Sequence, residues 1–334
     1  MIGDRDGTAA RLWSMAGLGT PMAVRVAATL RLADHIAAGS HTAAELAEAC
    51  GADQDALDRL LRYLAVRGVF HRDETGRYTL TPLGEPLRAD HPAGARAWFD
   101  IDGMGWGELS FVELLHSIRT GEAAFPQRYG RPYWEDMAAD PARIASFNAL
   151  LGADVAARAP GIVAGFDWAG LDHIVDVGGG DGSLLVAILT AHPDLRGTVV
   201  DLAETAQAAK ESFAAAGLGH RADAVTGSFF EPIQPGADAY LLSLVLHDWD
   251  DDSSTAILRR CAEAAGPTGR VLVIESIGDG EDTHTGMDLR MLCLYGARER
   301  GVAEFTALAQ RAGLHGTAVH PAGPSAIIEL RAAA

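Results

Sequence analysis

The sequence predicts an α/β fold, with a doubly wound, largely parallel sheet in the C-terminal half and a helical, winged-helix-like region before it. From residue 171 onward, short β-branched runs alternate with helical patterns, which is typical of a parallel sheet covered by helices. At 174–182, one such run ends in an acid and several glycines directly before a helical stretch. This order indicates a strand, a tight turn and a helix N-terminus, a geometry that brings the backbone close to a nucleotide-like ligand.

The N-terminal region is expected to be a helical module with one small β-hairpin. Pro21 marks a helix start, and Thr42 with Glu45 forms a capping box at the start of another helix. The expected elements are helices over 8–38, 42–50 and 53–67, followed by strands around 69–70 and 78–80. Because the apolar face of 8–38 has no obvious partner inside a compact domain, we expect a homodimer that buries it.

This outline matches a winged helix-turn-helix, for which DNA binding and dimerisation are the two interpretations. Residues 42–90 hold nine acids against six arginines, and the whole chain has a formal net charge of −18. Such a surface repels phosphates, so dimerisation is favoured and no nucleic-acid partner is expected.

Cysteine usage and hydropathy bear on the compartment. The three cysteines lie far apart, which indicates a reducing compartment rather than a disulfide framework. The sequence has no signal-like N-terminus and no apolar run of about 18 residues. We therefore expect a cytoplasmic protein with no membrane partner.

Residues 96–160 are expected to form a helical connector between a domain of residues 1–95 and a domain of residues 161–334. The connector is rich in aromatic side chains, which usually pack in a core but as a group are also suited to roof an apolar pocket. Trp134 is our candidate substrate contact in this stretch.

The C-terminal half alternates strands with helices. Strands are expected at 173–177, 197–201, 222–226, 238–245, 269–276, 316–320 and 325–330, and helices at 183–192, 204–216, 252–265, 285–295 and 302–313. Gly323 and Pro324 separate the last two strands, which are suited to an antiparallel hairpin at the edge of the sheet.

The spacing of the glycines distinguishes two ligand classes. A dinucleotide loop would place its third glycine at position 183, which is Ser183, whereas this loop has Gly178, Gly180 and Gly182. With Asp176 two residues before the first glycine, the loop resembles the S-adenosylmethionine loop of class I methyltransferases. The resemblance implies that Asp176 meets the amino-acid end of the cofactor; a plain βα turn is the alternative.

A second acid supports a ligand at this edge of the sheet. Asp201 ends the next expected strand, 25 residues after Asp176. A carboxylate there is placed to accept hydrogen bonds from both hydroxyls of a ribose. The alternative role of Asp201 is to cap the helix that follows.

His247 is the candidate base. It follows the apolar expected strand 238–245, and ligands of open α/β sheets bind beyond the carboxyl ends of the strands. An imidazole with a pKa of about 6.5 is a workable base for a phenol, whose pKa is about 10. Glu275 and Glu299 are the candidate carboxylates that orient it. A purely structural histidine is the alternative.

Seven segments make a family resemblance specific. They are 176–180, 200–202, 227–229, 246–249, 273–275, 288–292 and 296–300. On these motifs the chain resembles, over nearly its whole length, the small-molecule O-methyltransferases that include plant caffeic-acid and animal acetylserotonin enzymes and many actinobacterial antibiotic-tailoring relatives. The resemblance implies a Rossmann-like class I methyltransferase domain behind a winged-helix-like dimerisation domain, with S-adenosyl-L-methionine as cofactor and no metal.

Residue roles follow from the same match, position by position. The resemblance implies that His247 is the general base and that Glu275 and Glu299 flank it. The implied cofactor contacts are Asp176, Gly178, Gly180, Asp201, Ser228, Phe229 and Ser243, and the implied substrate contacts are Asn148, Asp288 and Met291. The sequence departs from familiar members at Ser228, Ser243 and Leu151, which affects details of the adenine and substrate contacts rather than the reaction class.

The segments 20–30, 115–121 and 287–292 resemble hydroxynaphthoate O-methyltransferases of antibiotic biosynthesis. We therefore expect methylation of a phenolic hydroxyl on a hydroxynaphthoic acid. A substrate carboxylate needs a cation, for which Arg11 is the first candidate and Arg119 and Arg298 are the others. The alternatives are hydroxylation or decarboxylation with the same cofactor, and a ligand-sensing winged-helix regulator.

Overall fold

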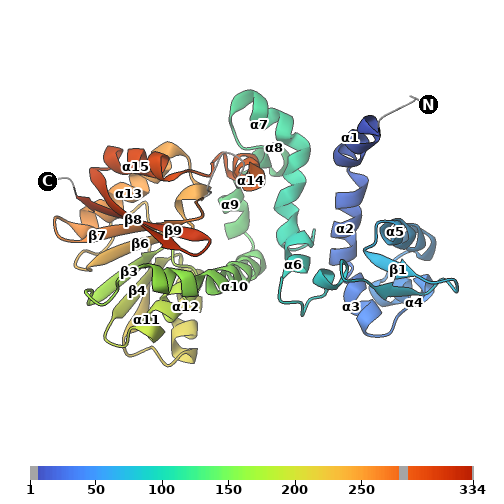
Figure 1. The fold of residues 1–334 in the computed structure, drawn as a ribbon, viewed down its shortest axis with the longest axis horizontal. Coiled ribbons are helices and arrows are strands. Elements are labelled where there is room, and N and C mark those ends of the chain that lie inside the picture. Colours follow the sequence, from blue (N-terminus) through green and yellow to red (C-terminus); the bar gives the residue numbers. More distant parts are fainter. Residues whose placement is uncertain (1–6, 278–284, 333–334) are drawn as a thin grey trace. The chain divides into compact units, whose positions relative to one another are not determined.

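The computed structural model describes residues 7–277 and 285–332, and it divides into two compact units, Met1–Trp106 and Gly107–Ala334 (Figure 1). Each unit has its own hydrophobic core: one cluster of buried residues in the first unit and two in the second. The three-part division at residues 95 and 160 stays a prediction.

The first unit is a helical module with one two-stranded hairpin. Its helices are α1 (Thr8–Ala16), α2 (Gly19–Thr29), α3 (Leu32–Ala37), α4 (Ala43–Cys50), α5 (Gln54–Val66) and α6 (Ala95–Phe99), with a 3-10 turn η1 (Glu85–Leu87) and strands β1 (Phe70–Arg72) and β2 (Tyr78–Leu80). As predicted, Thr42 and Glu45 form a capping box at the start of α4, and Gly51 ends that helix in the left-handed conformation.

The helix expected over 8–38 is in fact three helices, α1, α2 and α3. The break before α3 falls at Arg31, whose φ of 53° lies in the left-handed region. Because α3 buries Leu32 and Ile36 in the core of its own unit, the premise that 8–38 lacks a partner is wrong for this part. In contrast, α1 buries none of its residues, and its Trp13 is 75% exposed. The apolar face left for a second copy is therefore that of α1.

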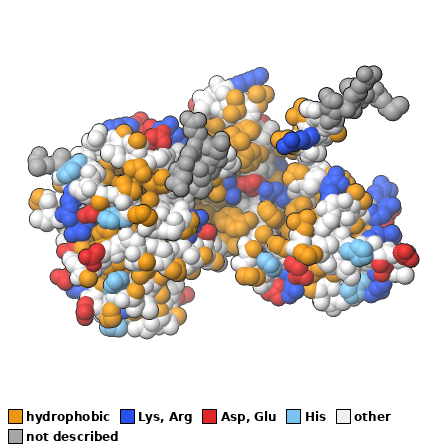
Figure 2. Space-filling view, in the orientation of Figure 1, with side chains coloured by type: hydrophobic (Ala, Val, Ile, Leu, Met, Phe, Trp, Pro, Cys, Tyr) orange, Lys and Arg blue, Asp and Glu red, His pale blue; other side chains and the backbone are white. Residues whose placement is uncertain are grey.

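Several arginines of the first unit are paired with acids of the same helix. Arg59 pairs with Asp55 and Arg62 with Asp58, both on α5. Figure 2 shows acidic and basic side chains mixed over the visible face of this unit. A mixed surface of this kind favours dimerisation over binding to a phosphate backbone.

The second unit is built on a seven-stranded sheet in the order β5-β4-β3-β6-β7-β9-β8. The strands are β3 (His173–Val177), β4 (Arg196–Asp201), β5 (Ala222–Thr226), β6 (Ala239–Ser243), β7 (Arg270–Glu275), β8 (Leu314–Ala322) and β9 (Ser325–Ala332). The first five are parallel, whereas β9 is antiparallel to β7 and β8 is antiparallel to β9. The predicted edge hairpin is thus confirmed.

Helices cover both faces of this sheet (Figure 1). They are α10 (Pro141–Gly165), α11 (Ser183–Ala191) and α12 (Ala203–Ala215) on one face and α13 (Asp251–Ala265) and α15 (Val302–Arg311) on the other. Strand β3 shows the alternation that this requires, because Ile174 packs in the first core whereas Val175 and Val177 pack in the second.

Shorter helices make up the rest of the unit. They are η2 (Met104–Glu113), which contains the boundary between the units, α7 (Leu114–Thr120), α8 (Phe125–Tyr129), α9 (Tyr133–Ala138), η3 (Leu246–Asp248) and α14 (Thr285–Tyr295). Within the described ranges, no helix combines the length and the apolar character needed to cross a bilayer.

The strand order reverses between β3 and β6. From β3 the chain moves outward to β4 and β5 and then returns to the other side of β3 as β6. Ligands of doubly wound sheets bind beyond the carboxyl ends of the strands at such a point. The glycine turn follows β3 and Ser243 ends β6, so the predicted site lies where the topology favours a ligand.

Candidate active site

A cavity of about 300 Å³ lies within the second unit, at the carboxyl ends of β3, β4 and β6. All the predicted cofactor contacts line it: Asp176, Gly178, Gly180, Asp201, Ser228, Phe229 and Ser243. Two predicted substrate contacts, Trp134 and Asn148, line it too. The fold therefore brings both groups of residues to one cavity, while the role of each residue stays a prediction.

The glycine turn after β3 has a backbone shape that other residues would strain. Gly178 and Gly180 have φ values of 73° and 60°, in the left-handed region. A Cβ atom on Gly178 would lie 3.0 Å from Cγ2 of Val245. The amide of Gly180 donates a hydrogen bond of 3.0 Å to Oδ2 of Asp201, which ties the turn to the end of β4. The turn therefore presents backbone to the cavity.

Asp176 is the buried acid behind this turn. The residue is 1% exposed, and neither carboxylate oxygen has a hydrogen-bond partner within residues 7–277 and 285–332. Burial, together with the nearby charge of Asp201, raises the pKa of Asp176 to about 7. Burial also raises the pKa of Asp201 to about 6, although the amides of Leu202 and Gly180 oppose the shift. A ligand that brings positive charge or hydrogen-bond donors would satisfy this pair.

An aromatic wall forms another side of the cavity. The ring of Trp134 is stacked with Tyr295 at 5.5 Å and with Trp249 at 6.5 Å between centroids, and it meets Phe147 edge-on at 5.5 Å. Phe229 approaches Trp249 edge-on at 5.6 Å. Flat apolar surfaces of this kind suit a planar aromatic ligand.

Two polar residues of the cavity already have partners. The amide of Asn148 donates a hydrogen bond of 3.3 Å to Oγ1 of Thr205, which joins α10 to α12. The hydroxyl of Ser228 accepts a hydrogen bond of 3.2 Å from the amide of Phe230. Each side chain is thus held in place, and each keeps capacity for a further hydrogen bond.

His247 lies on η3, within a cluster of carboxylates. Its Nδ1 is 3.1 Å from Oε1 of Glu299 and 3.9 Å from Oε2 of Glu275, and its Nε2 is 3.5 Å from Oδ1 of Asp248. Glu275 contacts the loop in a different way, because its Oε1 accepts a hydrogen bond of 3.0 Å from the amide of Leu246. Glu299 therefore makes the short contact with the imidazole, whereas Glu275 contacts the backbone of the loop; which of them orients the base stays a prediction.

The carboxylates decide the ionisation of this cluster. Burial lowers the pKa of His247, but the charges of Asp248, Glu275 and Glu299 outweigh it and raise the pKa to about 10. Burial raises the pKa of Glu275 to about 7 and that of Asp248 to about 6. The imidazole is thus a stronger base than a free histidine, and its resting form at neutral pH is the imidazolium.

Asp288 and Met291 lie on α14 and support the loop that carries Glu299. Oδ1 of Asp288 accepts a hydrogen bond of 2.9 Å from the amide of Glu299, and the carbonyl of buried Met291 accepts one from the amide of Ala297. Asp288, Met291 and His247 are not among the residues that line the cavity. The neighbours of His247, Asp248 and Trp249, do line it. The structure thus places Asp288 and Met291 behind the candidate base.

None of the candidate arginines is among the residues that line the cavity. Arg11 is exposed on α1 in the first unit, and Arg119 is exposed on α7. Arg298 pairs with Asp251 and Glu304. A role for Arg11 in binding a substrate carboxylate stays a prediction.

Sequence reasoning missed three residues of this region. Asp248 contacts the imidazole and lines the cavity, and its position next to His247 was a usable signal. Leu244 lines the cavity and has a φ of 54°, a left-handed conformation that is unusual for leucine. The sequence gives no sign of it, because the residues that usually adopt this conformation are glycine and asparagine. Arg300 is buried against the His247 loop, although arginine is rarely expected inside a protein.

Comparison with known proteins identifies the family. A model of the O-methyltransferase domain matches residues 111–315, and a model of the O-methyltransferase dimerisation domain matches residues 13–89. The 2,7-dihydroxy-5-methyl-1-naphthoate 7-O-methyltransferase of Streptomyces carzinostaticus is 56% identical over 322 residues, which cover 96% of this chain and 97% of that protein. The aclacinomycin 10-hydroxylase RdmB of Streptomyces purpurascens is 45% identical over 91% of this chain and 83% of its own length.

A solved structure agrees with these matches. The O-methyltransferase NcsB1 from neocarzinostatin biosynthesis, in complex with S-adenosylmethionine and 2-hydroxy-5-methyl naphthoic acid, superimposes with a TM-score of 0.93 at 56% identity, covering 96% of this chain and 98% of that one. The fold and cavity alone define a doubly wound α/β enzyme for a nucleotide-like ligand. The matches narrow that class: the chain belongs to the O-methyltransferase family, as its motifs predicted.

Proposed function

We propose that this protein transfers a methyl group from S-adenosyl-L-methionine to a phenolic hydroxyl of a hydroxynaphthoic acid in antibiotic biosynthesis. One observation supports this proposal most. His247, hydrogen-bonded to Glu299, is adjacent in sequence to residues that line a cavity, and the glycine turn, Asp176 and Asp201 line the same cavity. The 56% identical relative is named for methylating a dihydroxynaphthoate, which supports this substrate class.

The cavity residues fit this cofactor. When bound, the cofactor supplies an electrophilic methyl group on a sulfonium. The carboxylate of Asp176, which has no partner in the described structure, suits the ammonium of the amino-acid end, and Asp201 suits the ribose hydroxyls. Phe229 offers a ring for the adenine, with Ser228 and Ser243 as polar neighbours. Gly178 and Gly180 let the ligand approach the backbone.

His247 acts as the general base in this proposal. Because Nδ1 faces Glu299, the nitrogen that takes the hydroxyl proton is Nε2, which lies on the side of the cavity residue Asp248. A phenol with a pKa of about 10 is matched by the raised pKa of the imidazole, so proton transfer is close to balanced. Glu299 then stabilises the imidazolium, and the aromatic wall excludes water from the reacting atoms.

The remaining parts of the proposal concern the assembly and the compartment. The matched dimerisation domain and the exposed apolar face of α1 support a homodimer. Arg11 lies on that same helix, and we retain it as the candidate for a substrate carboxylate. The cysteines are free thiols, which supports a reducing, cytoplasmic setting.

The test is incubation of the purified protein with the cofactor and a panel of hydroxynaphthoic acids, followed by mass spectrometry. The proposal expects a product heavier by one CH₂ and formation of the spent thioether. The 45% identity to a protein named as a hydroxylase makes hydroxylation the second candidate, and it would add one oxygen atom instead. The proposal would be contradicted if no acceptor in the panel gave a product heavier by one CH₂.

A further inference from the structure

We propose that Arg300 is a positioning residue for the base, which it serves by holding the backbone of the His247 loop; this inference rests on the proposed function. The loop of residues 246–249 contains the candidate base and the cavity residues Asp248 and Trp249. Arg300 contacts the carbonyls at both ends of this loop, and its neighbour Glu299 contacts the imidazole inside it.

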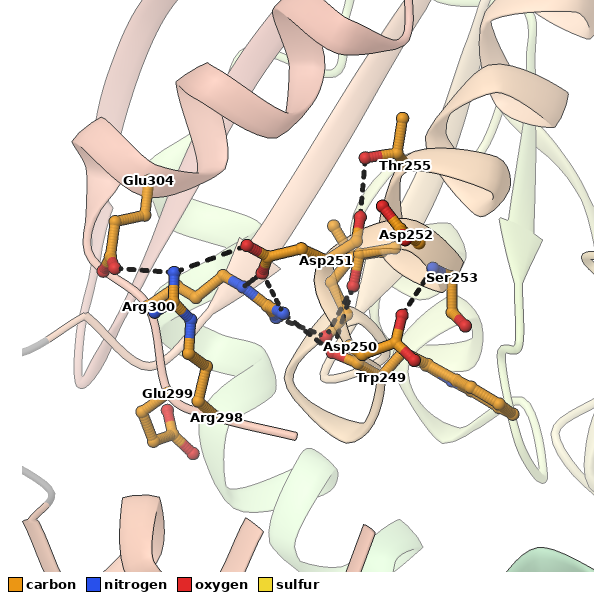
Figure 3. Close-up of polar contacts among 12 residues, drawn as sticks. Trp249, Asp250, Asp251, Asp252, Ser253, Thr255, Arg298, Glu299, Arg300 and Glu304 are labelled. Atoms are coloured by element: carbon orange, nitrogen blue, oxygen red, sulfur yellow. Dashed lines mark hydrogen bonds and ion pairs between the residues drawn. The ribbon is translucent and has the colours of Figure 1, made fainter. Parts of the chain in front are cut away.

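The contacts of Arg300 use its whole guanidinium. One terminal nitrogen donates a hydrogen bond of 2.8 Å to the carbonyl of Leu246, and the other donates one of 2.8 Å to the carbonyl of Trp249. The second nitrogen and Nε also donate to Oδ1 of Asp251, at 2.8 and 3.1 Å. Figure 3 shows the side chain of Arg300 between Asp251 and the backbone at Trp249. A single rigid fork thus fixes two carbonyls and one carboxylate.

Burial makes this contact a strong constraint. The side chain of Arg300 is 0% exposed, so its charge depends on Asp251 and on the two carbonyls for stabilisation. A lysine has one compact ammonium and cannot reproduce the planar fork. The hydroxyl of Ser254 also lies 3.2 Å from each carbonyl, but it is one neutral donor shared between two acceptors. Arg300 is therefore the charged donor that joins both ends of this loop to the segment that carries Glu299.

Arg298, which is not among the residues that line the cavity, provides a matched control. It lies two residues away and pairs with the same Asp251, at 3.6 Å, and with Glu304, at 3.0 Å. Its side chain is 50% exposed. Figure 3 shows Arg298 and Arg300 together with Asp251. A substitution of Arg298 changes the charge near Asp251 without removing either contact to a loop carbonyl.

The experiment compares Arg300→Lys with Arg298→Lys in the full-length protein. We expect Arg300→Lys to lower kcat about tenfold to a hundredfold, because a shift of about 1 Å in the base has an effect of that order. Affinity for S-adenosyl-L-methionine, measured by calorimetry, should change less than about twofold, since the residues assigned to the cofactor all lie outside the 246–249 loop. Arg298→Lys should leave both quantities within about twofold of wild type. A kcat for Arg300→Lys equal to that of Arg298→Lys would overturn the proposal.

A second readout needs no turnover. The pKa of the His247 imidazole is followed by NMR, with His247→Ala used for assignment. If Arg300 positions the imidazole against Glu299, Arg300→Lys should lower this pKa by at least about one unit, whereas Arg298→Lys should not. An unchanged His247 pKa in Arg300→Lys would contradict the positioning role even if kcat fell. Since this titration uses no acceptor, a failure of the proposed methyl transfer leaves the result interpretable.

If Arg300→Lys does not fold, Asp251→Asn replaces it. This variant keeps the arginine but removes the negative charge that binds it. We therefore expect kcat and the His247 pKa both to fall, each by less than in Arg300→Lys. A folded Asp251→Asn with the wild-type His247 pKa and kcat would overturn the proposal.

Discussion

Nδ1 of His247 lies 3.1 Å from Oε1 of Glu299, whereas the nearer oxygen of Glu275 is 3.9 Å away and its other oxygen holds the amide of Leu246. The two glutamates therefore do different work at the same histidine. Glu299 contacts the ring and Glu275 contacts the backbone beside it, while the charges of both glutamates and of Asp248 raise the pKa of the imidazole.

We expect this difference to appear in the pH dependence of Glu299→Gln and Glu275→Gln. Loss of the Glu299 charge should lower the His247 pKa more, and it should reduce the rate at high pH about tenfold because the ring loses its ionic partner. The pH–rate profiles of both variants, with a saturating acceptor, check this. If both variants shifted the pH–rate profile from wild type by the same amount, the two distances would not explain which carboxylate has the larger effect on the His247 pKa.

The raised His247 pKa predicts an alkaline rate increase. With a pKa of about 10, only the minority of molecules with a neutral imidazole can take the hydroxyl proton at pH 7, so kcat should rise roughly tenfold per unit between about pH 7 and 9. His247→Ala should lose this slope. A wild-type rate that is flat over this range would contradict the assignment of the titrating group.

The same shift has a consequence for stability. Because the folded pKa of His247 exceeds the unfolded value of about 6.5, its contribution is fully present below that value and is lost as pH rises through about 10. Urea unfolding should therefore show the stability advantage of wild type over His247→Ala shrinking between about pH 7 and 10. A stability difference between wild type and His247→Ala that grows from pH 7 to 10 would contradict a raised His247 pKa in the folded protein.

Asp176 predicts a pH-dependent affinity for the cofactor. Its raised pKa favours the protonated form in the free protein, so this group's contribution to stability is lost as pH rises from about 4 through 7. A ligand that brings a cation favours the carboxylate, and calorimetry should find binding about tenfold tighter at pH 8 than at pH 6. Asp176→Asn should bind more weakly and lose this dependence, whereas the exposed Asp223→Asn should behave like wild type. Retention of the full dependence in Asp176→Asn would place its origin elsewhere.

The exposed face of α1 predicts where a homodimer is sensitive. Trp13→Glu places a charge on that face and should shift sedimentation toward the monomer. Val66→Glu, on a similarly exposed apolar residue of α5, is the control and should stay dimeric. A Trp13→Glu protein that sediments like wild type would remove α1 from the interface.

Local signals in the sequence account for most of the fold that was predicted. The β-branched runs, the capping box at Thr42 and the glycine turn at Gly178 depend on neighbours along the chain, and the observed elements follow them closely. The break at Arg31 was missed because an arginine, not a glycine or proline, adopts the left-handed conformation there. Its Nε lies 3.0 Å from Oδ2 of Asp34, a contact that the sequence pattern does not reveal.

The site was predictable in its residues but less so in its arrangement. His247 and Glu299 stand 52 residues apart, and only the fold shows that this pair, and not His247 with Glu275, shares the short contact. Asp288 and Met291 were found as motif residues, yet they lie behind the Glu299 loop rather than along the cavity. Arg300 escaped notice because burial of its charge depends on Asp251 and on two carbonyls from another loop.

The central claim is that His247 removes the hydroxyl proton of the acceptor. The most direct measurement is the single-turnover rate of methyl transfer by His247→Ala, with labelled cofactor and the best acceptor. We expect a rate about 10²–10⁴ times below wild type with cofactor affinity unchanged. A single-turnover rate equal to that of wild type would contradict it.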